Sequence, residues 1–171
     1  MRDAILKIDQ DSPEDEMRQC LTFMLSGKVY GLDILNIKEI IEYGELTEVP
    51  MTPDFISGVI NLRGSVVPVI DLNKRFLGKA IECSKRTSII ILEVNSADLV
   101  IEIGVTVDIV NEVLDIHSSE IEPPPKMGNQ IQTNFINGMA KVDDKFLILL
   151  DVESLLSNDE LSIMGGIDQY T

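Results

Sequence analysis

The side chains that could carry out chemistry in this 171-residue chain are few and lie far apart. His117 is the only histidine, so the chain offers a single imidazole base and no histidine-based metal cluster. It precedes a turn into a short helix, where we expect an exposed structural histidine. Cys20 and Cys83 lack the spacing of metal ligands, which favours two reduced thiols, with Cys20 buried in a strand. Since a glycine-rich phosphate loop is also absent, we expect no enzymatic activity, metal or cofactor.

Asp71 and Asp151 are two carboxylates that could be imagined as a general acid and base. Each follows a β-type run and precedes a short apolar helix. An aspartate in that position accepts hydrogen bonds from the first backbone N–H groups of the helix. We therefore expect both residues to be helix N-caps.

The composition excludes several classes of partner. The net charge is −15 and no cluster of Lys or Arg offsets it, so nucleic acid and anionic membrane are poor partners. An acidic surface is also a common device for solubility. Hydrophobic residues make up 44% of the chain, enough for a packed core. The first residues lack the apolar core of a signal peptide and no apolar run approaches membrane-spanning length, so we expect a cytoplasmic protein without direct membrane insertion.

The pattern of apolar residues and turn signals predicts a β-rich fold. Residues 20–25 and 29–34 form one expected hairpin, and residues 55–62 and 65–71 form a second around Arg63-Gly64. Pro68 indicates an edge strand or a bulge in the second hairpin. Residues 34–41 fit a helical turn and a bulged strand equally well. We also expect a short helix over 72–76, a strand from Ser88, and a charged flexible arm over 1–18.

An internal repeat underlies these elements. Residues 31–42 align with residues 104–115 at an offset of 73, and the Phe-Ile-x-Gly of Phe55 recurs at Phe135 at an offset of 80. The second copy therefore carries seven extra residues, among them 127–130. A unit of about 70 residues is marginal alone, so two copies should share a core and leave a groove between them. The approximate halves are 20–80 and 88–156, and an exchange of strands between them is left open.

The second hairpin also carries a specific motif. Residues 55–72 read F-I-x-G-V-I-N-L-R-G-x-x-x-P-x-x-D-L, with Y-G-L-D-I upstream and I-L-L-D-V-E downstream. Over residues 19–156 the chain resembles the CheW family of bacterial chemotaxis coupling proteins. The resemblance implies a mostly β fold of two pseudo-repeated, SH3-like, five-stranded β-barrel subdomains with short helices. It leaves 157–171 as a C-terminal tail without a counterpart in the family.

The resemblance also implies a function, that of a non-enzymatic adaptor. Family members couple the cytoplasmic tips of membrane chemoreceptors (methyl-accepting proteins) to the regulatory domain of the histidine kinase CheA. Other CheW-like domains remain open as further partners in an array. The protein would then be cytoplasmic and recruited to membrane receptor clusters through its partners.

Candidate binding residues follow from the family's pattern. Those carried over for receptor or kinase binding are Ile37, Glu39, Gly58, Asn61, Arg63 and Val113. Four of these positions also have a structural explanation: Gly58 fits a backbone requirement, Ile37 fits the core, and Arg63 and Glu39 each fit a solvated surface charge. The two charges could instead form an ion pair that orients a partner, and such an exposed pair would contribute little to stability. Val113 is the repeat counterpart of Ile40.

Two other functions remain open. A CheW-like coupler could serve a surface-motility array, of the twitching or gliding kind, and the sequence does not separate this from chemotaxis. A regulatory domain could instead bind a small ligand in the groove. The absence of Trp and an aromatic content of 5% offer little lining for such a ligand site.

Overall fold

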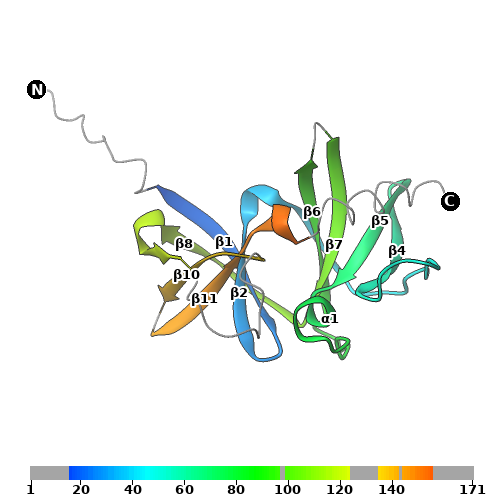
Figure 1. The fold of residues 1–171 in the computed structure, drawn as a ribbon, viewed down its shortest axis with the longest axis horizontal. Helices are drawn as coiled ribbons and strands as arrows, with labels where there is room; N and C mark the ends of the chain where they lie inside the picture. Colours follow the sequence, from blue (N-terminus) through cyan, green and yellow to red (C-terminus); the bar gives the residue numbers. More distant parts are fainter. Residues whose placement is uncertain (1–15, 97–98, 124–134, 143, 156–171) are drawn as a thin grey trace, which may run out of the picture.

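The computed structural model describes residues 16–96, 99–123, 135–142 and 144–155 (Figure 1). These residues form β-strands joined by short helices and turns. The strands are β1 (Met17–Leu25), β2 (Lys28–Asp33), β3 (Ile37–Glu42), β4 (Ile56–Leu62), β5 (Ser65–Asp71), β6 (Ser88–Ser96), β7 (Leu99–Val107), β8 (Ile109–His117), β9 (Ile121–Glu122), β10 (Ile136–Val142) and β11 (Lys145–Leu150). The helices are α1 (Leu72–Leu77) and three 3₁₀ turns, η2 (Ile34–Asn36), η3 (Ser118–Glu120) and η5 (Val152–Ser154).

The strands form two sheets that lie side by side (Figure 1). Sheet I has the order β3-β6-β7-β5-β4, and sheet II has the order β8-β1-β2-β11-β10-β9. An isolated bridge between Thr47 and Val59 extends sheet I beyond β4, where sheet II has the two-residue strand β9 beyond β10. The predicted mostly β fold of two repeated barrel-like subdomains is confirmed, although sheet II has six strands rather than five.

The repeat is visible in the strand pairing. Strands β4 and β5 have the bounds of β10 and β11 shifted by 80 residues, apart from the last residue of β5, Asp71. Both ladders are interrupted at the same place, between Ile56 and Gly58 in β4 and between Ile136 and Gly138 in β10. The parallel ladders also correspond, since β5 pairs with β7 in sheet I and β11 pairs with β2 in sheet II. The alignment found in the sequence therefore reflects a repeated structure.

The sheets do not follow the approximate halves 20–80 and 88–156. The hairpin of β1 and β2 lies in sheet II with β8–β11, whereas β6 and β7 lie in sheet I with β3–β5. Each sheet thus takes two strands from the other half of the chain, which is the exchange left open by the sequence. Strand β1 begins at Met17, inside the segment 1–18 expected to be an arm. Residues 1–15, the seven extra residues and the tail lie outside the described part.

The main core lies between the two sheets. In β6, Ile90 and Leu92 belong to a large buried cluster that also contains residues of β1, β2 and β11, whereas Ile89 and Ile91 belong to a small cluster within sheet I. Because successive side chains of a strand point to opposite faces, one face of β6 packs on sheet II and the other on its own subdomain. A separate small cluster around Cys20 fills the corresponding place in sheet II. The two subdomains therefore share the larger part of their core, as a unit too small to fold alone requires.

Arg75 of α1 connects the two copies of the repeat. Its guanidinium lies 4.3 Å from the ring centroid of Phe55 and 5.0 Å from that of Phe135, which are the repeat-related phenylalanines. A cation over two aromatic faces stabilises their packing. The first turn of this helix is capped by Asp71, which accepts a hydrogen bond from the Lys74 N–H at 3.0 Å.

Two local predictions resolve in an unexpected way. Residues 34–41 form both structures that the sequence left open, the 3₁₀ turn η2 followed by β3 with a bulge between Ile37 and Glu39. Of the two alternatives for Pro68, the edge strand is wrong, since β5 is flanked by β7 and β4, whereas the second hairpin does contain a bulge, between Ile56 and Gly58. The N–H and C=O of its partner Val59 bond to Thr47 instead, and the ladder with β7 starts only at Val69. The missing N–H of Pro68 therefore costs the sheet no hydrogen bond.

Candidate functional site

The turn between β4 and β5 places Arg63 in a conformation that is unusual for an arginine. Two residues, Arg63 and Gly64, connect the strands with φ values of 52° and 88°. Positive φ at both positions is the geometry of a type I′ hairpin turn, which favours Asn, Asp or Gly at the first position. The Asn61 side chain closes the turn by accepting a hydrogen bond from the Gly64 N–H at 3.1 Å. Non-glycine residues held in this region are concentrated at functional sites.

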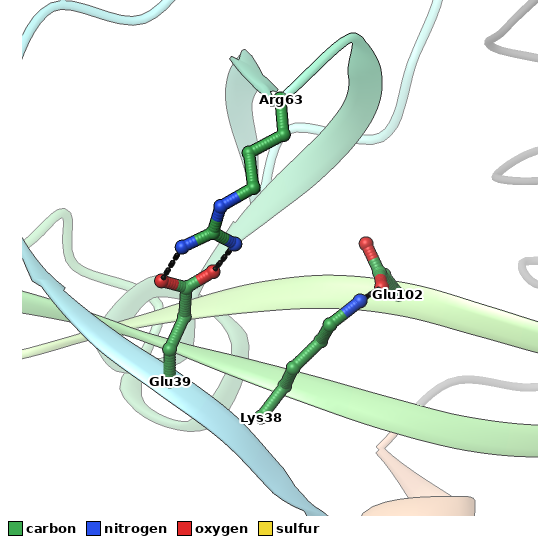
Figure 2. A network of polar contacts seen from close by, with 4 residues as sticks. All are labelled: Lys38, Glu39, Arg63 and Glu102. Atoms are coloured by element: carbon green, nitrogen blue, oxygen red, sulfur yellow. Dashed lines mark hydrogen bonds and ion pairs between the residues drawn. The ribbon is translucent and has the colours of Figure 1, made fainter.

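Arg63 reaches back from the turn to Glu39 of β3 (Figure 2). The two guanidinium nitrogens donate to the two carboxylate oxygens, at 2.6 Å (Nη1 to Oε2) and 3.0 Å (Nη2 to Oε1). This bidentate arrangement fixes the orientation of the guanidinium plane. The hydrogen bond from Arg63 holds the pKa of Glu39 below its ordinary value. The contact between these two predicted residues is thus present in the free protein.

A second ion pair lies beside the first. Lys38 contacts the Glu102 carboxylate of β7, and the hydrogen bond raises the pKa of Lys38 (Figure 2). The bulge in β3 explains why the neighbours Lys38 and Glu39 both join this cluster, because bulged residues no longer alternate regularly between the two faces. We refer to Lys38, Glu39, Arg63 and Glu102 as the charged cluster. Sequence reasoning missed Lys38 and Glu102, since only the register of β3, β6 and β7 brings them together.

Gly58 has a structural explanation. A Cβ at this position would lie 2.6 Å from the backbone oxygen of Thr47, so only glycine allows the Thr47–Val59 bridge. Its repeat counterpart Gly138 is also closely packed, since a Cβ there would lie 2.5 Å from the Ile121 side chain. The glycine therefore positions the segment before β4, whatever else it contacts.

The two apolar candidates occupy different environments. Ile37 is half-buried and packs against the main core. This packing explains an apolar residue at the position without any contact to a partner protein. Val113 of β8 is 49% exposed, and its repeat counterpart Ile40 of β3 is 42% exposed. Glu39 and Ile40 lie on β3, Val113 lies on β8, and Arg63 lies in the turn that follows β4. Asn61, at the end of β4, is committed to the turn.

The residues considered for catalysis have structural roles. Asp151 accepts a hydrogen bond from the Glu153 N–H at 3.2 Å, so both aspartates are helix caps as predicted. Burial raises the pKa of the Cys20 thiol to about 11, which keeps it protonated and unreactive at neutral pH. His117 ends β8 and is exposed. Within the described part of the chain, no group of three His, Cys, Asp or Glu side chains is placed to hold a metal ion.

An open cavity lies on sheet I next to α1. Its described lining consists of Glu48, Val49, Thr52, Pro53, Asp54, Ile56, Ser57, Asp71, Lys74 and Ala80. The carboxylate of Asp71 is already occupied by two backbone N–H groups, those of Lys74 and Ile81. The cavity is therefore mostly polar, without the aromatic or extended apolar lining typical of a ligand site.

Comparison with known proteins adds the family. Residues 19–160 match the model of the CheW-like domain. The chain belongs to the CheW-like family. It is 35% identical to the chemotaxis protein CheW of Klebsiella aerogenes over 150 residues, with 88% of each chain covered. It is 37% identical to the chemotaxis protein CheW of Bacillus subtilis over 140 residues, covering 81% of this chain and 86% of the relative.

A solved structure shows the same CheW-like fold. The crystal structure of the scaffolding protein TtCheW from Thermoanaerobacter tengcongensis superposes with a TM-score of 0.75 at 39% identity. The match covers 88% of this chain and 93% of that protein. The described residues of the CheW-like chain contain no helix long and apolar enough to cross a membrane.

Proposed function

We propose that this chain is a non-enzymatic adaptor that couples membrane chemoreceptors to the histidine kinase CheA in bacterial chemotaxis. The observation that carries the proposal is the CheW-like domain over residues 19–160. Relatives with this domain are named as chemotaxis proteins, and the similar solved structure is named as a scaffolding protein. In this role the protein is cytoplasmic and reaches the membrane through its receptor.

The receptor surface of this adaptor centres on Arg63 and Glu39. Three features support the assignment: the arginine is 72% exposed, its guanidinium is oriented by a bidentate partner, and its backbone is held in a conformation that disfavours arginine. An exposed ion pair contributes little to folding, so stability does not explain the arrangement. A planar fork of donors suits the carboxylates and carbonyls of a receptor helix. The exposed apolar Val113 and Ile40 on β8 and β3 would supply contact area.

The kinase surface lies at the ends of the subdomains. CheA's regulatory domain shares this fold by family resemblance, so the two proteins would associate pseudo-symmetrically, end against end. Val100 next to the β6–β7 turn and Phe146 next to the β10–β11 turn are 63% and 58% exposed. Apolar side chains at hairpin tips are suitable anchors for such a contact, because buried apolar area usually carries more affinity than rim charges.

Co-sedimentation tests the proposal directly. Vesicles that carry a full-length chemoreceptor of the same cell are mixed with the chain, with CheA, and with both. The expected result is that the chain sediments with the vesicles and increases the amount of CheA that follows. A chain that stays in the supernatant, and fails to bind CheA's regulatory domain at tens of micromolar, would contradict the proposal. Comparing swimming with surface spreading in a deletion strain then separates chemotaxis from a surface-motility array.

A further inference from the structure

The chain provides its own control for the charged cluster, because the second copy of the repeat has the same strand bulge but keeps only one of the four charged residues. Strand β8 corresponds to β3 at the offset of 73, and it too is irregular at the equivalent place: Asn111 and Glu112 stand opposite Thr22 alone. The bulge is therefore a property of the repeated fold. Each subdomain therefore has two bulge residues, and the sequence alone decides whether their side chains are charged.

Three of the four charged residues, in contrast, occur in one copy only, whereas Glu39 has the counterpart Glu112. The repeat counterpart of Lys38 is Asn111, and the counterpart of Arg63 is Asp143. Glu102 of β7 corresponds to Val29 of β2, again at the offset of 73. Since the second subdomain keeps the bulge without these three residues, the fold does not require them. Their presence in sheet I needs a different explanation.

The accessible part of the charged cluster is cationic. The side chains of Arg63 and Lys38 are 72% and 43% exposed, whereas those of Glu39 and Glu102 are 22% and 23% exposed. Each carboxylate thus lies under the basic group that it binds. The two basic groups are close enough to affect one another, since Arg63 opposes the rise in the pKa of Lys38. The exposed carboxylate of Glu93 is also close enough to raise the pKa of Lys38, so Lys38 and Arg63 are two accessible basic groups among carboxylates, on a chain with a net charge of −15.

We infer that Lys38 is a second binding residue of the receptor surface, and that Lys38 and Arg63 together recognise carboxylates on an acidic face of the receptor's helices. The inference rests on the proposed function and specifies the chemistry of the partner. Glu102 is a positioning residue that orients the lysine, as Glu39 orients the arginine. Charges of this kind at an interface mainly raise the association rate and make binding salt-dependent.

Charge variants of the full-length chain test the inference on chemoreceptor vesicles. Lys38→Glu is expected to weaken sedimentation at least about tenfold and to flatten its dependence on salt, while Lys38→Gln has a smaller effect in the same direction. Lys28→Glu is the matched control: Lys28 is an exposed lysine at the start of β2, in the other sheet, and the same change of net charge there should alter binding less than twofold. Binding of each variant to CheA's regulatory domain is measured in parallel and should not change.

The outcomes are distinct. If the unmodified chain fails to sediment with the vesicles, the receptor half of the proposed function is wrong, and the inference fails with it. If the unmodified chain binds but Lys38→Glu and Lys28→Glu bind equally well, the function stands and the role of Lys38 is wrong. An equal loss of receptor and CheA binding in Lys38→Glu would mean that the lysine acts on the fold, which also overturns the inference.

Discussion

Replacing Arg63 by asparagine tests whether this arginine is present for binding or for the stability of the fold. A non-glycine residue in the left-handed region costs about 1–2 kcal/mol, and asparagine is among the residues that tolerate this region best. With φ at 52° and a glycine following, Arg63→Asn creates the preferred sequence of a type I′ turn. The ion pair lost with the guanidinium is exposed and contributes little. We therefore expect the variant to be at least as stable as the unmodified chain.

The assays follow from these two effects. For a chain of this length, relief of about 1 kcal/mol raises Tm by roughly 2–4 °C, which is measurable by thermal unfolding followed by circular dichroism. Binding to chemoreceptor vesicles should fall at least about tenfold in the same variant, the usual effect of losing a charge-assisted contact at an interface. Stabilisation with loss of function is typical of a residue retained for activity.

Two control variants make the result interpretable. Arg63→Val also removes the charge but introduces a β-branched side chain at positive φ, so it should lower Tm while weakening binding to the same extent. Glu39→Gln keeps the arginine and removes its orienting partner, so it should weaken binding less than Arg63→Asn. If Arg63→Asn lowers Tm by several degrees, the arginine stabilises the fold. Unchanged binding in both arginine variants would likewise refute the site.

Three further predictions concern the fold. Gly58→Ala should destabilise the chain by about 2–3 kcal/mol in urea unfolding, because its Cβ would meet the Thr47 oxygen at 2.6 Å; no change would mean that the loop moves away freely. The buried hydroxyl of Tyr30 has no partner among the described residues, so Tyr30→Phe should stabilise by about 1 kcal/mol, and a loss of that size would reveal a partner. Because the halves exchange strands, fragments 1–82 and 83–171 should each be unfolded by circular dichroism but recover native spectra when mixed; a fragment that folds alone would contradict the shared core.

Much of the fold could be predicted because local signals and the repeat agree. The two-residue turn at Arg63-Gly64 and the cap at Asp71 each define where a strand begins or ends, and Gly58 marks the bulge within β4. The strand exchange could not be predicted in the same way. The continuous apolar run over residues 89–92 indicates that β6 has two buried faces, but it does not show which hairpin covers them. That choice depends on packing between residues distant in the sequence, such as those of β1 and β7 in the main core.

The site was predictable to the same limited extent. The family motif identified Arg63 and Glu39, and their opposite charges suggested the pair that the structure contains. Lys38 and Glu102 are 64 residues apart, and their contact depends on a bulge that shifts the register of β3 against β6. The apolar residues of 34–41 fit a bulged strand and a helical turn equally well, so the local sequence does not fix the position of the bulge. The partner of a charged residue beside the motif, such as Lys38, can be identified only once the pairing of the strands is known.

The residue type at the first position of the β4–β5 turn is a further feature of the sequence that supports the candidate site. A two-residue hairpin turn normally places Asn, Asp or Gly there, because each tolerates positive φ. This chain places the preferred Gly at the second position but an arginine at the first, so the turn has its preferred residue type everywhere except at one exposed charged residue. When one position departs from an otherwise consistent local pattern, the departure indicates a requirement outside the fold. In the second copy, the residue that aligns with Arg63 is Asp143, which is one of the residue types preferred at this position of a type I′ turn.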